Sequence, residues 1–394
     1  MRPASFELPM DVLRTRQNAK WAKFGPEVLP AWVAEMDFSI AHPIRRAIDQ
    51  LVGEQEYGYP HRAAGGHGDE GLAGALARRM KSRFDWTIDP TLVQPLSDLV
   101  QGTFAAVWAF SDPGDGVLLH LPAYPPFHAS IHDTGRRLDA QYLRSDGTGY
   151  VLDLDEMARI GDARTRILML CNPQNPTGRV FSRDELLAMG RLAIERDWII
   201  ISDEIHSDLV FDGATHIPIA SLSPEIAART VTITSATKSF NIPGLRCGAM
   251  HFGTAGLRER FHARVPTRVL GSPSIIGIDA TIAAWDHGQP WLDEVVPYLD
   301  ANRQRMAAFI KAELPGIRFH APEATYLCWL DCADLGLPGK AVDFFHDRAK
   351  VAFSPGEAFD PANDRAVRFN FATSAPILER ILVRMADAVR SNIR

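Results

Sequence analysis

The chain has 394 residues, of which 46% are apolar and 23% are charged, as in ordinary globular proteins. This length predicts two domains, or one large and one small domain. The net charge of −6, from 42 basic and 48 acidic residues, and the lack of a polybasic block exclude nucleic acid as the main partner. No uncharged apolar run approaches the roughly 20 residues that span a membrane. Because residues 1–9 also lack an apolar signal core, we expect a cytoplasmic protein with no membrane partner.

Two patterns that suggest ligand binding receive a purely structural interpretation. The four cysteines do not form a disulfide framework, and Cys328 and Cys332 lack a nearby His or Cys pair that would complete a metal site. We expect all four to be small buried apolar side chains, and we expect no metal ion. The segment Gly65-Gly66-His67-Gly68 does not follow a strand, so we expect a surface turn there rather than a phosphate loop.

Apolar runs of strand length alternate with helical patterns through the middle of the chain. The runs are Val117–Leu121, Arg166–Cys171, Trp198–Ser202, Val231–Thr234 and Cys247–Phe252. Between two of them, Ser182 and Glu185 form a capping box that opens a helix-like pattern. Continuous apolar strands separated by helices predict an α/β fold, with a mainly parallel sheet covered by helices on both faces.

The character of the sequence changes near residue 286. A helical stretch, Trp291–Ala312, precedes strand-like pieces at residues 324–330 and 366–371 and then a closing helix, which predicts a smaller α+β domain. The first fifty or so residues are rich in Pro and Trp and are typical of an arm. We therefore expect an arm that joins the small domain (residues 1–47), a large domain (48–285) and a small C-terminal domain (286–394).

Four of the predicted strands lead into a polar or aromatic residue. Tyr124 follows the first strand, and Asn175 lies in the turn after the second. Asp203 comes at the end of the third strand, and Lys238 follows the fourth. Because ligands bind beyond the carboxyl ends of parallel strands, we expect these four side chains to line one site.

These residue types suit a planar, cationic pyridine ring that carries a phosphate. A lysine forms an imine with an aldehyde and then acts as a base, while a carboxylate keeps the ring nitrogen protonated. An aromatic ring stacks on the pyridine, an amide donates to a phenolic oxygen, and hydroxyls with an arginine hold the phosphate. Each residue alone is a weak signal, because such a lysine is usually a solvated surface residue and Asn-Pro often marks a plain turn. Their order and spacing together are specific.

The segments 172–178, 203–209 and 235–246 resemble fold-type I enzymes of the class I/II aminotransferase superfamily, which depend on pyridoxal 5'-phosphate (PLP). The resemblance covers nearly the whole chain. It implies a seven-stranded type of sheet in the large domain, with a smaller α+β domain at the C-terminus. It also implies that Lys238 carries the cofactor as a Schiff base and that Asp203 is the partner of the pyridine nitrogen.

The resemblance implies further contacts with cofactor and substrate. The implied cofactor ligands are Asn175 for the phenolic oxygen, Tyr124 for the ring face, Ser235 and Arg246 for the phosphate, and backbone amides near Gln101 and Gly102 at a helix N-terminus. Arg368, in Val367-Arg368-Phe369-Asn370, matches the arginine that binds the substrate α-carboxylate.

Within the superfamily, the chain most closely resembles the MalY/PatB-type C–S lyases, the cystathionine β-lyase-like branch. The segments that carry this resemblance are 18–21, 32–38, 57–59 and 203–209. His206 stands where many aminotransferases carry tyrosine and is expected at the cofactor, while Trp32 is expected at the substrate. In the resembling enzymes Tyr59 reaches the cofactor phosphate of the neighbouring subunit, which implies a homodimer with shared active sites.

Three places depart from the pattern of these enzymes. Glu35 replaces an aspartate in the Trp32–Phe38 segment. Asp98 precedes the helix expected to bind the phosphate, so we expect its side chain to point away from that anion. The segment Phe359–Asp364 replaces a Gly-rich loop near the substrate carboxylate. This last difference leaves the substrate less certain than the cofactor.

The expected reaction is β-elimination from an L-cysteine S-conjugate such as L-cystathionine, with Lys238 as base and with thiol, pyruvate and ammonia as products. The main alternative is a PLP-dependent aminotransferase, which the lysine motif does not separate from a lyase. His206 and the Trp32–Phe38 segment favour the lyase, and the Phe359–Asp364 loop keeps a decarboxylating or amine-oxidising variant open. A non-catalytic sensor of PLP or of an amino acid is disfavoured. Sensors with this fold normally carry a fused DNA-binding domain, and this chain has no spare helix-turn-helix segment.

Overall fold

The computed structural model describes residues 5–61 and 71–393, so the predicted turn at Gly65–Gly68 lies outside the described residues. A seven-stranded sheet forms its centre, in the order β2-β10-β9-β8-β7-β3-β4. The strands are β2 (Val93–Leu96), β3 (Gly116–Leu121), β4 (Arg137–Tyr142), β7 (Thr165–Cys171), β8 (Ile199–Asp203), β9 (Thr230–Thr234) and β10 (Gly248–Phe252). Strands β9, β8, β7, β3 and β4 pair in parallel, whereas β10 runs antiparallel to both β9 and β2. The predicted α/β fold with a mainly parallel sheet is confirmed.

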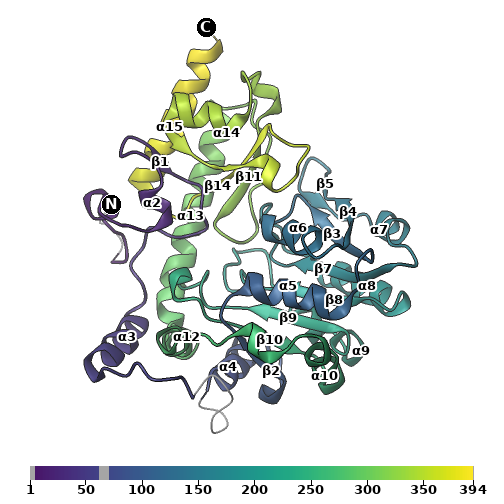
Figure 1. The fold of residues 1–394 in the computed structure, drawn as a ribbon. Coiled ribbons are helices and arrows are strands. Elements are labelled where there is room, and N and C mark those ends of the chain that lie inside the picture. The colour runs from purple at the N-terminus through teal and green to yellow at the C-terminus, as the bar shows by residue number, and fades with distance from the viewer. Residues whose placement is uncertain (1–4, 62–70, 394) are drawn as a thin grey trace.

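Helices cover both faces of this sheet because its strands bury side chains on both sides (Figure 1). On β7, Ile167 and Met169 pack in a cluster with one set of helices, and Leu168 and Leu170 pack in a cluster with the other set. The first set is α5 (Leu99–Phe110), α6 (Pro125–His132) and α10 (Ala255–Arg264). The second set is α7 (Leu154–Ile160), α8 (Arg183–Glu195) and α9 (Pro224–Ala227). The predicted capping box of Ser182 and Glu185 opens α8.

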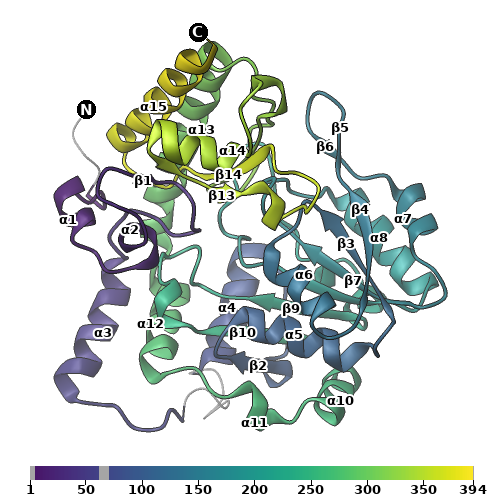
Figure 2. The same ribbon diagram turned by 45° about the horizontal axis from the view of Figure 1, so that its top comes forward.

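The C-terminal part of the chain forms a three-stranded antiparallel sheet in the order β11-β14-β13. Its strands are β11 (Leu327–Asp331), β13 (Ser354–Pro355) and β14 (Ala366–Asn370), accompanied by α14 (Ala341–Phe344) and α15 (Ala375–Ile393). The predicted long helix is α13 (Gln289–Glu313), which runs from beside α12 (Ile275–His287) to the C-terminal elements (Figures 1 and 2).

The N-terminal segment joins the C-terminal elements, although most of the chain separates them in sequence. It contains α1 (Met10–Arg14), α2 (Ala19–Ala22), β1 (Leu29–Pro30) and α3 (His42–Glu54), and β1 pairs in parallel with β12 (Val351–Ala352). Helix α3 packs against α12, as does α4 (Leu72–Phe84). Further short elements include β5 (Arg144–Ser145), β6 (Tyr150–Val151) and α11 (Thr267–Leu270).

The division of the chain into an arm, a large domain and a small domain is a proposal. Its second boundary, near residue 286, falls at the end of α12, but its first boundary, near residue 48, falls inside α3. A helix is one hydrogen-bonded unit, so we propose to place the first boundary before His42.

The cysteines and the helices bear on two further expectations from the sequence. All four cysteines are buried and free, as predicted. In residues 5–61 and 71–393, no helix combines the length and the apolar character needed to cross a bilayer.

A buried ion pair fixes the N-terminal segment. The Nζ atom of Lys20 lies 2.9 Å from Oδ2 of Asp37, and both side chains are only 1% exposed. Trp21 Nε1 donates to the other carboxylate oxygen at 2.7 Å, and Lys20 Nζ donates to the carbonyl of Glu35 at 3.0 Å. Several residues that carry the C–S lyase resemblance therefore form one buried polar cluster.

Replacing Lys20 by alanine is expected to lower the free energy of unfolding by about 3–5 kcal/mol, because Asp37 would remain as an unpaired buried charge. Urea denaturation followed by circular dichroism measures this loss. The matched control is Lys81→Ala, which removes an exposed ion pair with Asp85 and should leave stability unchanged. Equal effects of the two substitutions would contradict a special role for the buried pair.

Candidate active site

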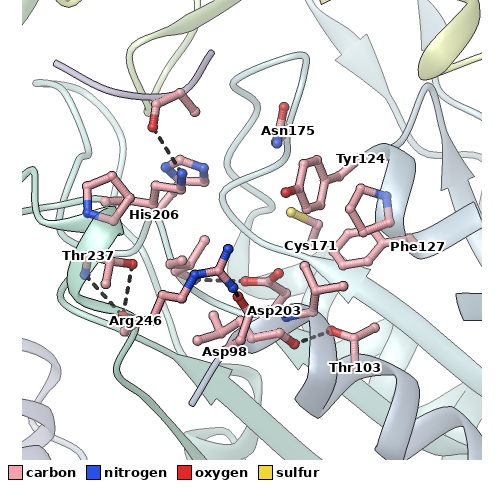
Figure 3. A pocket seen from close by; sticks show the side chains of 18 of the residues that line it. Asp98, Thr103, Tyr124, Phe127, Cys171, Asn175, Asp203, His206, Thr237 and Arg246 are labelled. Carbon is pink, nitrogen blue, oxygen red and sulfur yellow. Dashed lines mark hydrogen bonds and ion pairs between the residues drawn. The ribbon is translucent and has the colours of Figure 1, made fainter. Parts of the chain in front are cut away.

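A cavity of about 270 Å³ lies at the carboxyl ends of the central parallel strands. Tyr124 reaches it after β3, Asn175 after β7 and Asp203 from the end of β8 (Figure 3). Lys238 reaches it after β9. The four predicted side chains therefore do line one cavity. Its wall is completed by Arg368 from β14 of the C-terminal sheet and by residues 33 and 34 of the N-terminal segment.

Lys238 is held by a backbone carbonyl at the cavity wall. Its Nζ donates to the carbonyl oxygen of Ala34 at 3.0 Å, and the hydroxyl of Tyr326 donates to the same oxygen at 3.0 Å. Burial, reinforced by the positive charge of Arg368, lowers the pKa of Lys238 from 10.5 to about 8. An amine with this pKa is deprotonated in about one molecule in ten at pH 7, far more often than an ordinary lysine, which suits a general base.

Asp203 is buried, and its Oδ1 accepts a hydrogen bond from the amide of Ile205 at 3.0 Å. Burial raises the pKa of this carboxyl to about 6, although the Ile205 amide and the charge of Lys238 act in the opposite direction. The group is therefore mainly ionised at neutral pH. A protonated pyridine nitrogen beside it would stabilise that ionised form further.

Arg368 is a buried cation that donates hydrogen bonds to three parts of the chain. Its Nη1 donates to Oδ1 of Asn175 at 3.0 Å, and its Nη2 donates to the Trp32 carbonyl at 3.0 Å and to Oγ of Ser354 at 3.1 Å. The guanidinium lies 4.8 Å from the ring centre of Phe359, which places the divergent 359–364 loop directly at this residue. Burial lowers the pKa of Arg368 to about 10, so it remains charged at neutral pH. A positively charged, fixed guanidinium at a cavity wall suits a carboxylate.

His206 also lines the cavity, and its ring meets that of Tyr326 edge-on, with 6.0 Å between the ring centres. Burial and then the charges of Lys238 and Arg368 lower the pKa of His206 to about 3, so the imidazole is neutral. Its Nδ1 is buried and has no hydrogen-bond partner among the described residues. A neutral ring nitrogen of this kind is available to a polar group of a ligand.

The cavity is also lined by Asp98, Ser235, Thr237 and Arg246. The hydroxyl of Ser235 donates to the carbonyl of Cys247 at 2.6 Å and accepts from the amide of Thr237 at 3.1 Å. Arg246 Nη1 lies 2.7 Å from Oδ2 of Asp98. The expectation that Asp98 points away is therefore wrong, because its carboxylate faces the arginine that was expected to bind phosphate.

Four other predicted residues lie elsewhere or contribute differently. The amides of Gln101 and Gly102 are bonded to Asp98 within the first turn of α5, and the Gln101 side chain donates to the carbonyl of Val269. Leu99, Val100 and Thr103 line the cavity instead.

Trp32 contributes its carbonyl to Arg368, but its ring packs edge-on against Phe24. Tyr59 is fully exposed and lies in a separate hollow with residues 267–276.

Sequence reasoning did not identify three other contributors to the site. The Ala34 carbonyl carries no side-chain signal, and Ser354 and Tyr326 reach the site only because β13 and β11 bring them there. The sequence marked the Phe359 loop as divergent but gave no sign of its contact with Arg368.

The residues present fit PLP. They supply an amine for an aldehyde (Lys238), a carboxylate for the pyridine nitrogen (Asp203), and an aromatic ring for the pyridine face (Tyr124). Asn175, whose Oδ1 accepts from Arg368, keeps an amide NH2 that is suited to the phenolic oxygen, and the neutral His206 offers its buried Nδ1 to a polar group. A cluster of hydroxyls with Arg246 is suited to phosphate. Cys171 at the same cavity is not a competing nucleophile, because burial raises the pKa of its thiol well above the usual value.

The model of the family Aminotransferase class I and II matches residues 35–385. The chain belongs to this family. It is 33% identical over 381 residues to the cystathionine beta-lyase PatB of Bacillus subtilis, a match that covers 95% of this chain and 97% of PatB. The family and the PatB-type branch implied by the sequence are therefore confirmed.

Solved structures agree with this assignment. A putative PLP-dependent beta-cystathionase from Corynebacterium diphtheriae has a TM-score of 0.91 and 33% identity, and the match covers 98% of this chain and 99% of that chain. The crystal structure of OvoB has a TM-score of 0.89 and 38% identity, with coverage of 96% and 97%. The similarity extends over both sheets.

The link between Arg368 and Lys238 is testable. Replacing Arg368 by methionine removes a positive charge that disfavours protonated Lys238, so the pKa of the amine should rise above its expected value of about 8. Competitive acetylation of the cofactor-free protein over a pH series, read by peptide mass spectrometry, gives this pKa. A pKa that stays constant or falls in the variant would show that the two cations do not interact.

Proposed function

We propose that this protein is a PLP-dependent C–S β-lyase that cleaves L-cystathionine or another L-cysteine S-conjugate to thiol, pyruvate and ammonia. The observation that carries the proposal is the placement of Lys238, with its lowered pKa, in one cavity with Asp203 and the fixed guanidinium of Arg368. The chain that builds this cavity is 33% identical to a cystathionine beta-lyase over 95% of its length.

Substrate orientation is assigned to Arg368. The substrate α-carboxylate would bind to this guanidinium, whose other bonds to Asn175, Trp32 and Ser354 keep it in place before the substrate arrives. A pre-positioned guanidinium does not lose conformational entropy when it binds, which favours one orientation of the amino acid. The Lys238 amine lines the same cavity and would be available to the Cα proton.

Proton transfer is assigned to Lys238. PLP, when bound, supplies an electron-poor ring that accepts the electron pair left at Cα. Asp203 would keep the ring nitrogen protonated, and Lys238 would take the Cα proton while the Ala34 carbonyl fixes the position of its Nζ. The sulfur on Cβ would then leave and gain a proton to form the thiol. Water supplies the oxygen of pyruvate and releases the ammonia.

A shared site in a homodimer is also proposed, as is a cytoplasmic location. The support for the dimer is the position of Tyr59, which is fully exposed and lies outside the cavity of its own chain. The resemblance assigns this tyrosine to the phosphate in the neighbouring subunit. The low net charge and the soluble composition support the location.

The purified, PLP-loaded protein is expected to form pyruvate continuously from L-cystathionine with no keto acid added. Lys238→Ala should abolish this turnover, because no other amine of lowered pKa faces the cavity among the described residues. Lactate dehydrogenase coupling measures pyruvate, and a thiol reagent measures the second product. Turnover that begins only when a keto acid is supplied would assign the protein to the aminotransferases instead.

Mixing two inactive variants tests the shared site. A Lys238→Ala chain and a Tyr59→Ala chain should form heterodimers in which one site combines an intact Lys238 with an intact Tyr59. Activity should therefore reappear after the two proteins are unfolded and refolded together, up to one working site per heterodimer. Each variant refolded alone is the control. No recovery, despite heterodimers seen by mass spectrometry, would contradict the sharing of Tyr59.

A further inference from the structure

We propose that the Asp98 carboxylate competes with the cofactor phosphate for Arg246 and for the first amides of α5, and so sets the affinity of the protein for PLP. This inference rests on the cofactor named in the proposed function. In this role Asp98 weakens the binding of the cofactor phosphate.

The Asp98 carboxylate accepts hydrogen bonds from groups that an anion bound in the cavity would also use. It is the N-cap residue of α5, with extended backbone angles (φ −159°, ψ 141°). Its Oδ1 accepts from the amide of Val100 at 2.8 Å and from that of Gln101 at 3.3 Å, while Oδ2 lies 2.7 Å from Arg246 Nη1. One carboxylate thus uses both the helix N-terminus and the arginine.

A phosphate needs the same groups. Free amides and the positive end of the dipole at a helix N-terminus attract phosphate, and so does a guanidinium. Figure 3 shows Asp98, Thr237 and Arg246 at one cavity, which Val100 and Ser235 also line. A phosphate held by Arg246 would therefore meet the Asp98 carboxylate, which lies 2.7 Å from that arginine. Two anions at one helix end repel each other, and one of them must give up its bonds to the amides and to Arg246.

The exposure of the pair shows that this exchange is physically accessible. The Arg246 side chain is 70% exposed and the Asp98 side chain is 30% exposed. Both charges therefore retain access to water, and separating them does not strand a buried ion. The cost of PLP binding is thus a lost cap and a broken ion pair, which lowers affinity without preventing binding.

The experiment compares PLP, pyridoxal and inorganic phosphate on the wild-type chain and on Asp98→Asn. The variant keeps an oxygen that caps the helix but loses the charge. Removal of one like charge beside the phosphate should tighten PLP binding on the order of tenfold. Binding of pyridoxal, which lacks the phosphate, should not change. Cofactor absorbance measures the first two ligands. A rise in melting temperature at a given phosphate concentration, larger in the variant, measures the third.

Asp153→Asn is the matched control, because Asp153 caps α7 through the Glu156 amide and does not line the cavity. It should leave all three affinities unchanged. Asp98→Ser provides a second variant with a good helix cap if the asparagine variant folds poorly.

Weaker or unchanged PLP binding by Asp98→Asn, with pyridoxal binding unaffected, would overturn the proposal and make Asp98 a support for Arg246 or a bystander. If the wild-type chain takes up no PLP, the proposed function fails instead. The inorganic phosphate measurement still decides between competition and support in that case.

Discussion

A buried guanidinium is the constraint on which the assembly of this site depends. Arg368 carries its charge inside the protein, and a buried charge is tolerated only when it is paired or hydrogen-bonded. Its bonds go to the Trp32 carbonyl, to Asn175 and to Ser354, which come from the N-terminal segment, the turn after β7 and the C-terminal sheet. Satisfying one side chain therefore brings together three parts of the chain that are far apart in sequence.

The same charge shapes the chemistry next to it. Arg368 and Lys238 are cations near one cavity, and their repulsion adds to the effect of burial on the lysine amine. The negative charges of Glu35, Asp203 and Asp98 act in the opposite direction and raise the pKa of the amine. Several carboxylates thus offset the charges of Lys238 and Arg368 before any ligand binds. A substrate carboxylate at Arg368 would offset that cation and so raise the pKa of the Lys238 amine.

Local sequence patterns predicted the parts of the fold that depend on local physics. Strand β7, strand β9 and the capped helix α8 lie within one or two residues of their predicted places, because apolar runs and capping boxes act through near neighbours. The edge strands β2 and β4 were not predicted. Each of them contains polar residues and so lacks a continuous apolar run. Their strand conformation depends on pairing, of β2 with β10 and of β4 with β3.

For the site, the sequence predicted residue types at strand ends but not their partners. Lys238, Asp203, Asn175 and Tyr124 converge because parallel strands end at one edge, a rule that needs no side-chain detail. The contact between Asp98 and Arg246 spans 148 residues, and no local pattern encodes it. The Trp32 ring illustrates the same limit, because its direction is decided by packing against Phe24.

The carbonyl of Ala34 has a consequence for the dynamics of the molecule. It accepts bonds from Lys238 and Tyr326, and it belongs to a segment tied to the C-terminal elements by the two-residue strand β1 and by Asn370. These contacts are separate from the hydrogen bonds of the central sheet, so this segment can open as a unit of its own. A local unfolding event there would release the lysine while the large sheet stayed intact. The amide exchange rates of residues 29–38 would thus report on the readiness of the base, independently of global stability.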